Sequence, residues 1–168
     1  MARIPYADPA RPDIAALAER ITRERGGRML NLYRMLLNSP PVAEGWLTLF
    51  TAIRQKAKLA DRYRELATLR VAVINGADYE FEAHVPFALK AGVTQAQLDG
   101  IRAGHAPEGL DETDRAVLDY TEAMTKSVRV DDALFARVRA RFDDQELVEL
   151  TATIAGYNLV SRFLEALH

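Results

Sequence analysis

Three residues in the middle of the sequence have the types and the spacing that acid–base chemistry needs: Glu65, Glu80 and His84. Glu80 and His84 are four residues apart, so on a helix they share one face. A carboxylic acid and an imidazole on a partly dry surface can pass protons to a bound molecule. Burial raises the pKa of Glu and lowers that of His, which brings the pKa values of the acid–base pair closer together.

Glu65 can join this pair only if the chain reverses direction between them. On one unbroken helix, Glu65 and His84 would be about 28 Å apart at 1.5 Å per residue. Asn75-Gly76 predicts the reversal, because Gly is the usual residue after the last turn of a helix. Glu65 and His84 would then face each other across a helix–helix seam, with the Tyr79 phenol at the start of the second helix.

The elements around this seam are predicted to be helices, because helical periodicity dominates and no segment alternates as a strand does. The predicted helices cover residues 12–24, 29–37, 46–53, 59–74, 78–91, 94–101, 111–126, 131–141 and 144–167. Asp78 is expected to cap the helix that follows the reversal, and Thr94 with Gln97 predicts a capping box. Pro86 falls inside that helix, and the sequence leaves open whether the helix bends or restarts there.

The fold class predicted from these elements is all-α, a compact multi-helix domain with the 59–91 helix hairpin at its centre. The connections are short, and no linker rich in Pro, Gly or Ser divides the chain. Residues 1–27 are interpreted as an N-terminal arm and first helix, and residues 28–168 as the helical domain. We therefore expect a single domain overall.

Composition excludes several functional classes. The chain has 168 residues, 49% of them hydrophobic and 27% charged, with a net charge of -2, which is typical of a globular protein without an electrostatic footprint for nucleic acid. There is no cysteine, which excludes disulfides, thiolate metal sites and cysteine nucleophiles. The beginning of the chain is polar and Pro-rich, and no apolar run is long enough to span a membrane. We expect a cytoplasmic location, with no nucleic-acid or membrane partner.

Residues 28–168 resemble the carboxymuconolactone decarboxylase and alkyl hydroperoxidase D-like (AhpD-like) family. The shared motifs are ELATLR at 65–70, YEFEAH at 79–84, ALKAGVT at 88–94, ELVEL at 146–150, GYN at 156–158 and NLYR at 31–34. The block from Glu65 to His84 is the most specific part. The peroxidase branch of the family has Cys-x-x-Cys-x-x-x-His, but Ala77 and Glu80 occupy the two cysteine positions here. Peroxide reduction through a disulfide cycle is therefore excluded.

The resemblance implies a decarboxylase-like lyase acting on a small unsaturated lactone acid. Loss of CO2 leaves a dienolate that must be protonated, and no cofactor is implied. His84 is then predicted as the acid/base, with Glu65 as an orienting or relaying carboxylate and Tyr79 beside them. Glu80 is predicted to line the substrate pocket together with Arg70 and Tyr157. The resemblance also implies a homo-oligomer, a trimer or hexamer.

Structural alternatives accompany each of these roles. His84 could be a hydrogen-bonded core histidine, and Glu65 could be held in an ion pair by Arg62, Arg64 or Arg70. The position of Arg70 favours a structural salt bridge, and Tyr157 could serve packing alone. A metal held by Glu65, Glu80 and His84 has no strong spacing signature, so no metal site is predicted. The alternative function is a non-catalytic protein that binds small molecules in the same pocket.

Overall fold

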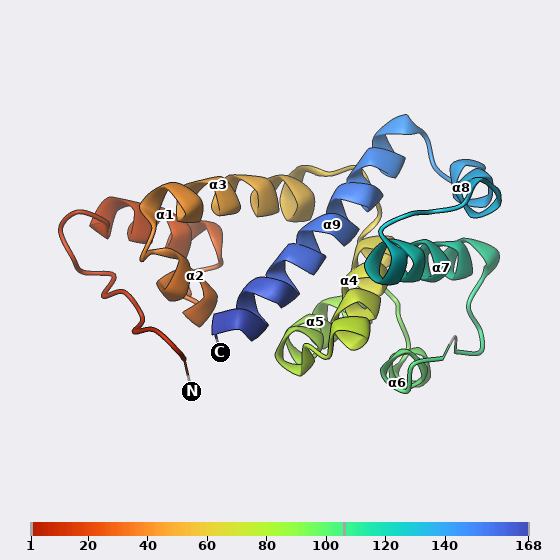
Figure 1. The fold of residues 1–168 in the computed structure, drawn as a ribbon, viewed down its shortest axis with the longest axis horizontal. Helices are drawn as coiled ribbons and strands as arrows, with labels where there is room; N and C mark the ends of the chain where they lie inside the picture. The colour runs from red at the N-terminus through yellow and green to blue at the C-terminus, as the bar shows by residue number, and fades with distance from the viewer. Residues whose placement is uncertain (1, 106, 168) are drawn as a thin grey trace. The chain divides into compact units, whose positions relative to one another are not determined.

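The computed structural model describes residues 2–105 and 107–167, and all regular secondary structure in these residues is helical, which confirms the predicted all-α fold. The elements are α1 (Ala15–Glu24), α2 (Asn31–Leu36), α3 (Pro40–Thr51), a π-helical turn η1 (Ala52–Lys56), α4 (Asp61–Asn75), α5 (Asp78–Lys90), α6 (Gln95–Arg102), α7 (Glu112–Ser127), α8 (Asp132–Arg139) and α9 (Asp144–Leu167) (Figure 1). Within the described residues, no helix is both long enough and apolar enough to cross a membrane.

The chain forms two compact units. One holds the residues up to Lys56 together with the C-terminal end from Ala166, and the other runs from Ala57 to Glu165. All six site residues predicted from the sequence lie in the second unit. The domain boundary predicted at residue 28 stays a prediction.

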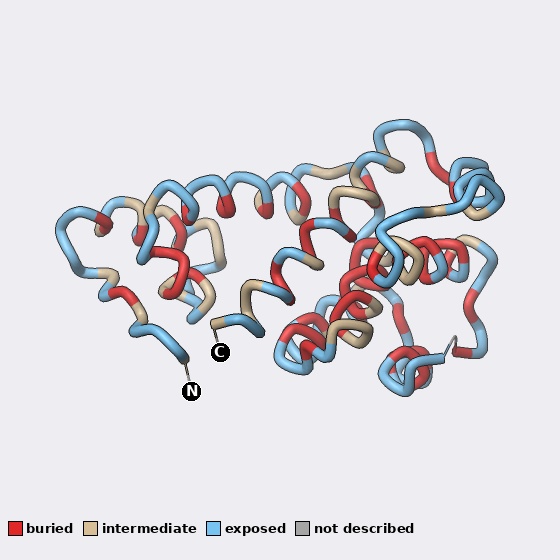
Figure 2. Tube along the Cα trace, viewed as in Figure 1, coloured by how far each residue is buried: buried red, intermediate tan, exposed pale blue. Residues whose placement is uncertain are grey.

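Helix α4 is the central element of the second unit. It packs against α5, α6 and α7, and most of its length is buried (Figure 2). A helix that is covered on several sides leaves its polar side chains without water, so Arg64, Glu65 and Thr68 need partners within the protein. Thr68 donates to the Arg64 carbonyl oxygen at 2.9 Å. The other two groups belong to the site described below.

The reversal between α4 and α5 occurs where the sequence predicts it. Gly76 follows the last residue of α4 with φ 67°, a left-handed conformation that Gly adopts without steric cost. The capping role expected for Asp78 is wrong, because Ala77 occupies the N-cap position and Asp78 is the first helical residue. Gly76 and Ala77 alone separate the two helices, so α5 begins at Asp78, one residue earlier than it would if Asp78 were the N-cap. The Asp78 carboxylate then lies in the first turn, where the helix dipole favours negative charge.

Helix α5 continues without interruption from Asp78 to Lys90 and includes Pro86. The question that the sequence leaves open is thus settled against a restart at Pro86. Glu80 and His84 belong to one continuous helical segment and keep the four-residue spacing that puts them on the same face.

Arg62 connects α4 to the ends of three other helices. Its guanidinium donates to both carboxylate oxygens of Asp114 in α7, at 2.9 and 2.7 Å. It also donates to the Gly92 carbonyl oxygen after α5, at 2.6 Å, and to Gln97 Oε1 in α6, at 3.3 Å. Gln97 completes a capping box with Thr94, which confirms that prediction. These contacts fix α4 relative to α5 and therefore the register of the seam.

Candidate active site

Glu65 and His84 form a buried hydrogen-bonded pair across the α4–α5 seam. His84 Nδ1 lies 2.7 Å from Glu65 Oε2, and the two residues are 5% and 1% exposed. This is the proximity that a reversal at Gly76 predicts. With the Nδ1 proton donated to the carboxylate, the neutral imidazole carries its lone pair on Nε2. The pair thus presents Nε2 as the atom for proton transfer, while its catalytic role stays a prediction.

Arg64 provides the positive charge that a buried carboxylate needs. Its Nε donates to Glu65 Oε1 at 3.1 Å, and its Nη1 donates to Asp61 at 2.7 Å. Of the three arginines considered as partners for Glu65, the structure therefore selects Arg64. Removing one member of such a buried pair is strongly unfavourable. Arg64, Glu65 and His84 form a continuous chain of contacts from the edge of the unit to its interior.

Aromatic rings enclose His84 from two directions. Tyr157 of α9 meets the imidazole edge-on, with ring centroids 5.0 Å apart and an interplanar angle of 88°. Phe87, one turn further along α5, lies 5.9 Å away. Tyr157 is 2% exposed, so this side of the imidazole is dry. The predicted substrate-binding role of Tyr157 stays a prediction; its ring packs against His84.

Glu80 is a second buried carboxyl group, held between α5 and α9. It is 3% exposed, and its Oε2 lies 2.6 Å from Ser161 Oγ. Burial raises the pKa of Glu80 to about 7; the hydrogen bond from Ser161 lowers it, and the negative charge of Glu165 raises it further. Its Oε1 is buried and has no hydrogen-bond partner within the described residues. Glu80 is therefore a neutral acid below pH 7.

Ser161 is the residue of this site that the sequence prediction missed. The available signal was its spacing: Ser161 follows Tyr157 by four residues, as His84 follows Glu80. These residues form the two contacts between α5 and α9 described above: Ser161 with Glu80, and Tyr157 with His84. Sequence spacing alone did not indicate which face of α9 would pack on α5.

Tyr79 and Arg70 lie elsewhere in the same unit. Tyr79 is 64% exposed at the start of α5. Arg70 forms an ion pair with Glu122 of α7, the structural salt bridge that its position in α4 favours. Their predicted roles toward a substrate therefore depend on surfaces other than the buried Glu65–His84 pair, and they stay predictions.

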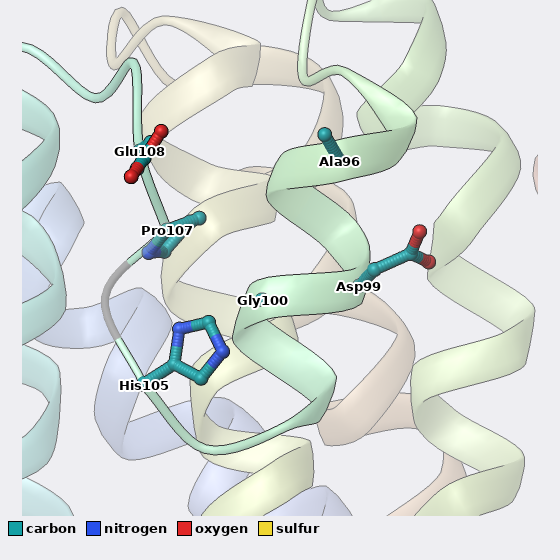
Figure 3. Close-up of a pocket in the computed structure, with 6 residues that line it drawn as sticks. All are labelled: Ala96, Asp99, Gly100, His105, Pro107 and Glu108. Carbon is teal, nitrogen blue, oxygen red and sulfur yellow. The ribbon is translucent and has the colours of Figure 1, made fainter.

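A surface hollow between α6 and the segment after it is separate from this site. It is lined by Ala96, Asp99, Gly100, His105, Pro107 and Glu108 (Figure 3). Asp99 points away from the segment that carries His105 and Glu108, so the three polar groups do not converge. Within the described residues, no group of three or more His, Asp or Glu side chains is arranged to hold a metal ion. The buried cluster around His84 is the stronger candidate for chemistry.

Comparison with known proteins places these features in a family. The model of the carboxymuconolactone decarboxylase family matches residues 40–123, half of the chain. This segment includes Glu65, Glu80 and His84. Ser161 and Tyr157 lie beyond the matched segment, on α9.

Similar proteins extend over more of the chain. The uncharacterized protein YdfG of Bacillus subtilis is 31% identical over 101 residues, which cover 59% of this chain and 69% of YdfG. The uncharacterized protein YnjA of Escherichia coli is 33% identical over 125 residues, which cover 73% of this chain and 65% of YnjA, just under two thirds of its length. A peroxidase-related protein of Ralstonia eutropha, described as an AhpD core, shares the fold with a TM-score of 0.81 at 20% identity, covering 99% of this chain and 90% of that one.

Proposed function

Because the chain belongs to the carboxymuconolactone decarboxylase family, we propose that it is a cofactor-independent lyase that removes CO2 from a small unsaturated lactone acid. The observation that carries the proposal is the buried contact between His84 Nδ1 and Glu65 Oε2. It orients the imidazole through Nδ1, and we assign the proton transfer to the other ring nitrogen, Nε2. Acid–base catalysis by a positioned imidazole typically contributes 10²–10⁴-fold to a rate.

The proposed reaction has two steps. The bond between the ring carbon and the substrate carboxylate breaks, CO2 leaves, and the bonding electrons delocalise toward the lactone carbonyl as a dienolate. The neutral imidazole of His84 first takes a proton from solvent on Nε2; the resulting imidazolium gives this proton to carbon and returns to the neutral form. Glu65 holds the Nδ1 proton throughout and stabilises the imidazolium. Tyr157, which is buried, covers one side of the imidazole, and Phe87 lies on another side.

Peroxide reduction is not proposed, because the sequence contains no cysteine. Ala77 and Glu80 stand at the positions where the peroxidase branch carries its thiols. Neither side chain can form a disulfide or a sulfenic acid. The chemistry available to this site is proton transfer.

The test is an ultraviolet absorbance assay with carboxymuconolactone and related unsaturated lactone acids, using wild type, His84→Asn and His105→Ala. Asn keeps a polar group for Glu65, and His105 is an exposed histidine that serves as the matched control. We expect loss of substrate absorbance with wild type and His105→Ala, and at least a 10²-fold slower reaction with His84→Asn. Equal rates for all three proteins would remove His84 from the chemistry. Binding without turnover would favour the non-catalytic alternative.

A further inference from the structure

The Glu80 carboxyl group is buried in the same site and has no role in the reaction steps described above. It lies on the face of α5 that carries His84, one helical turn away, which corresponds to about 6 Å along the axis. Its Oε2 is held by Ser161, and its Oε1 is buried without a partner within the described residues. A buried polar atom without a hydrogen bond is costly, and such atoms mark places where a ligand supplies the missing partner.

Ser161 can set which oxygen of Glu80 donates. Its hydroxyl has one hydrogen but two acceptors in reach, Glu80 Oε2 at 2.6 Å and the Tyr157 carbonyl oxygen at 3.0 Å. When the hydrogen points to Tyr157, a protonated Glu80 donates from Oε2 to Ser161. When the hydroxyl turns toward Oε2, the carboxyl proton belongs on Oε1. In that second arrangement Oε1 becomes a hydrogen-bond donor directed at a ligand.

We propose that Glu80 is a second catalytic residue, a neutral carboxylic acid whose Oε1–H donates a hydrogen bond to the carbonyl oxygen on which negative charge develops in the substrate. The inference rests on the proposed lyase function and specifies its substrate class: a small molecule with a carbonyl group conjugated to the carbon that loses CO2. A protonated buried carboxyl group is a strong donor to a developing oxyanion.

The two residues divide the reaction between them. As the carbon–carboxylate bond breaks, charge moves to the carbonyl oxygen, where Glu80 stabilises it by a hydrogen bond and keeps its proton. His84 then protonates the carbon, and the electrons return from oxygen to the ring. The proton that the product gains comes from His84 and is replaced from solvent. The spacing of one helical turn suits a small ring that lies along α5 with its oxygen toward Glu80.

The charged groups around Glu80 determine when it is neutral. Helix α4 contributes Glu65 and Arg64, which compensate each other through a direct contact. Helix α9 contributes the exposed Glu165, whose charge raises the pKa of Glu80, and Ser161, whose hydrogen bond lowers it; burial is the largest cause of the rise to about 7. Above pH 7, Glu80 ionises and would repel the developing oxyanion. Activity should therefore fall as the pH rises through 7.

The experiment compares the pH dependence of kcat/KM for wild type, Ser161→Ala, Glu165→Gln and Glu80→Gln, with carboxymuconolactone as the probe. Removing Ser161 takes away an interaction that lowers the pKa, so the alkaline limb should move to higher pH. Glu165→Gln takes away an interaction that raises the pKa, so its limb should move to lower pH. Glu80→Gln keeps a donor but cannot ionise, so its profile should lose the limb near pH 7. Limbs that do not move in Ser161→Ala and Glu165→Gln, or a Glu80→Gln profile that matches that of wild type, would overturn the proposal.

A binding measurement separates this inference from the lyase function. If the probe binds but is not turned over, Kd replaces kcat/KM: wild-type Kd should rise about tenfold per pH unit above 7, and Kd of Glu80→Gln should stay constant. That outcome would refute the lyase and the catalytic role, and would retain Glu80 only as a hydrogen-bond donor to the carbonyl group of the bound ligand. If the lactone acid is turned over but the alkaline limb of the pH profile is the same in wild type and in all three variants, the lyase function is retained and the role of Glu80 is refuted. Absence of both binding and turnover would reject the lactone acid as the ligand class and the inference with it.

Discussion

Ser161 Oγ, in α9, lies 2.6 Å from Oε2 of Glu80, which sits in the first turn of α5. The contact ties a group that ionises near neutral pH to the longest helix of the chain. Because Glu80 is 3% exposed, its charged form has little water to stabilise it, and one hydroxyl only partly compensates. Protonation of Glu80 therefore influences the free energy of unfolding as well as any chemistry at the site.

Replacing Glu80 by Gln should change how stability depends on pH. The folded protein holds the Glu80 proton up to a pKa of about 7, whereas the ordinary value is 4.5. Between these values the folded state binds more protons than the unfolded state, so wild-type stability falls as the pH rises through this window. From pH 4.5 to above 7, wild type should lose about 3 kcal/mol relative to Glu80→Gln. Urea unfolding of both proteins at several pH values measures this difference.

The control for that series is Glu82→Gln on the same helix. Glu82 is exposed and pairs with Arg102 at 2.5 Å, with side chains 60% and 49% exposed. Its stability difference from wild type should stay small and vary little with pH. If Glu80→Gln and Glu82→Gln gave the same pH dependence, Glu80 would not be the titrating group.

Glu65→Gln should slow the reaction while preserving the fold. The amide oxygen can accept a hydrogen bond from either Arg64 or His84 Nδ1 but not from both, and the neutral amide cannot stabilise an imidazolium as a carboxylate does. Turnover of the lactone acid should drop by roughly 10²-fold, with an unchanged far-ultraviolet circular dichroism spectrum. An unfolded Glu65→Gln protein would instead indicate that the pair serves stability, the structural alternative considered from the sequence.

Arg62→Gln should destabilise the protein by about 3 kcal/mol, because it leaves Asp114 buried without its bidentate partner. The Asp114 side chain is 2% exposed, so water cannot replace the lost contacts. Arg137→Gln is the comparison: it removes a pair with Asp119 in which both side chains are about half exposed, and it should cost less than 1 kcal/mol. Equal unfolding midpoints for the two variants would contradict the anchoring role of Arg62.

The elements of the site hairpin were predictable because local signals define them. Gly76 ends α4, Thr94 with Gln97 begins α6, and the spacing of Glu80 and His84 puts both on one face. The partners across helices were not predictable in the same way. Ser161 is 81 residues from Glu80, and only the packing of α9 on α5 brings them together. No local sequence signal identifies Arg64, rather than Arg62 or Arg70, as the partner of Glu65. Each arginine finds its partner according to which helix lies on its side of α4.

Val128→Gly should stabilise the protein. Val128 ends α7 with φ 64° and ψ -33°, a conformation that a β-branched residue adopts only with strain, and its side chain is 85% exposed. Relief of the strain outweighs the added entropy of Gly in the unfolded chain, for a net gain of up to about 1 kcal/mol. The melting temperature reports the change. Val148→Gly, at an exposed valine in helix α9, should have the opposite sign.

The homo-oligomer implied by the family resemblance stays a prediction. The rings of Trp46, Phe50 and Phe81 are buried within the chain, so they do not provide an exposed apolar surface for another subunit. Light scattering at micromolar concentration should give the mass of a trimer or hexamer. A monomeric mass of 18.8 kDa would contradict the homo-oligomer.

The contacts between α5 and α9 make the site depend on the number of residues in α9. Glu80 meets Ser161 and His84 meets Tyr157, so both contacts depend on one rotational setting of α9. A single residue inserted in α9 before Tyr157 would rotate both side chains by about 100°, and both contacts would be lost without any substitution at the site. Among related chains, insertions should therefore be tolerated in the connections before α9 and selected against within it.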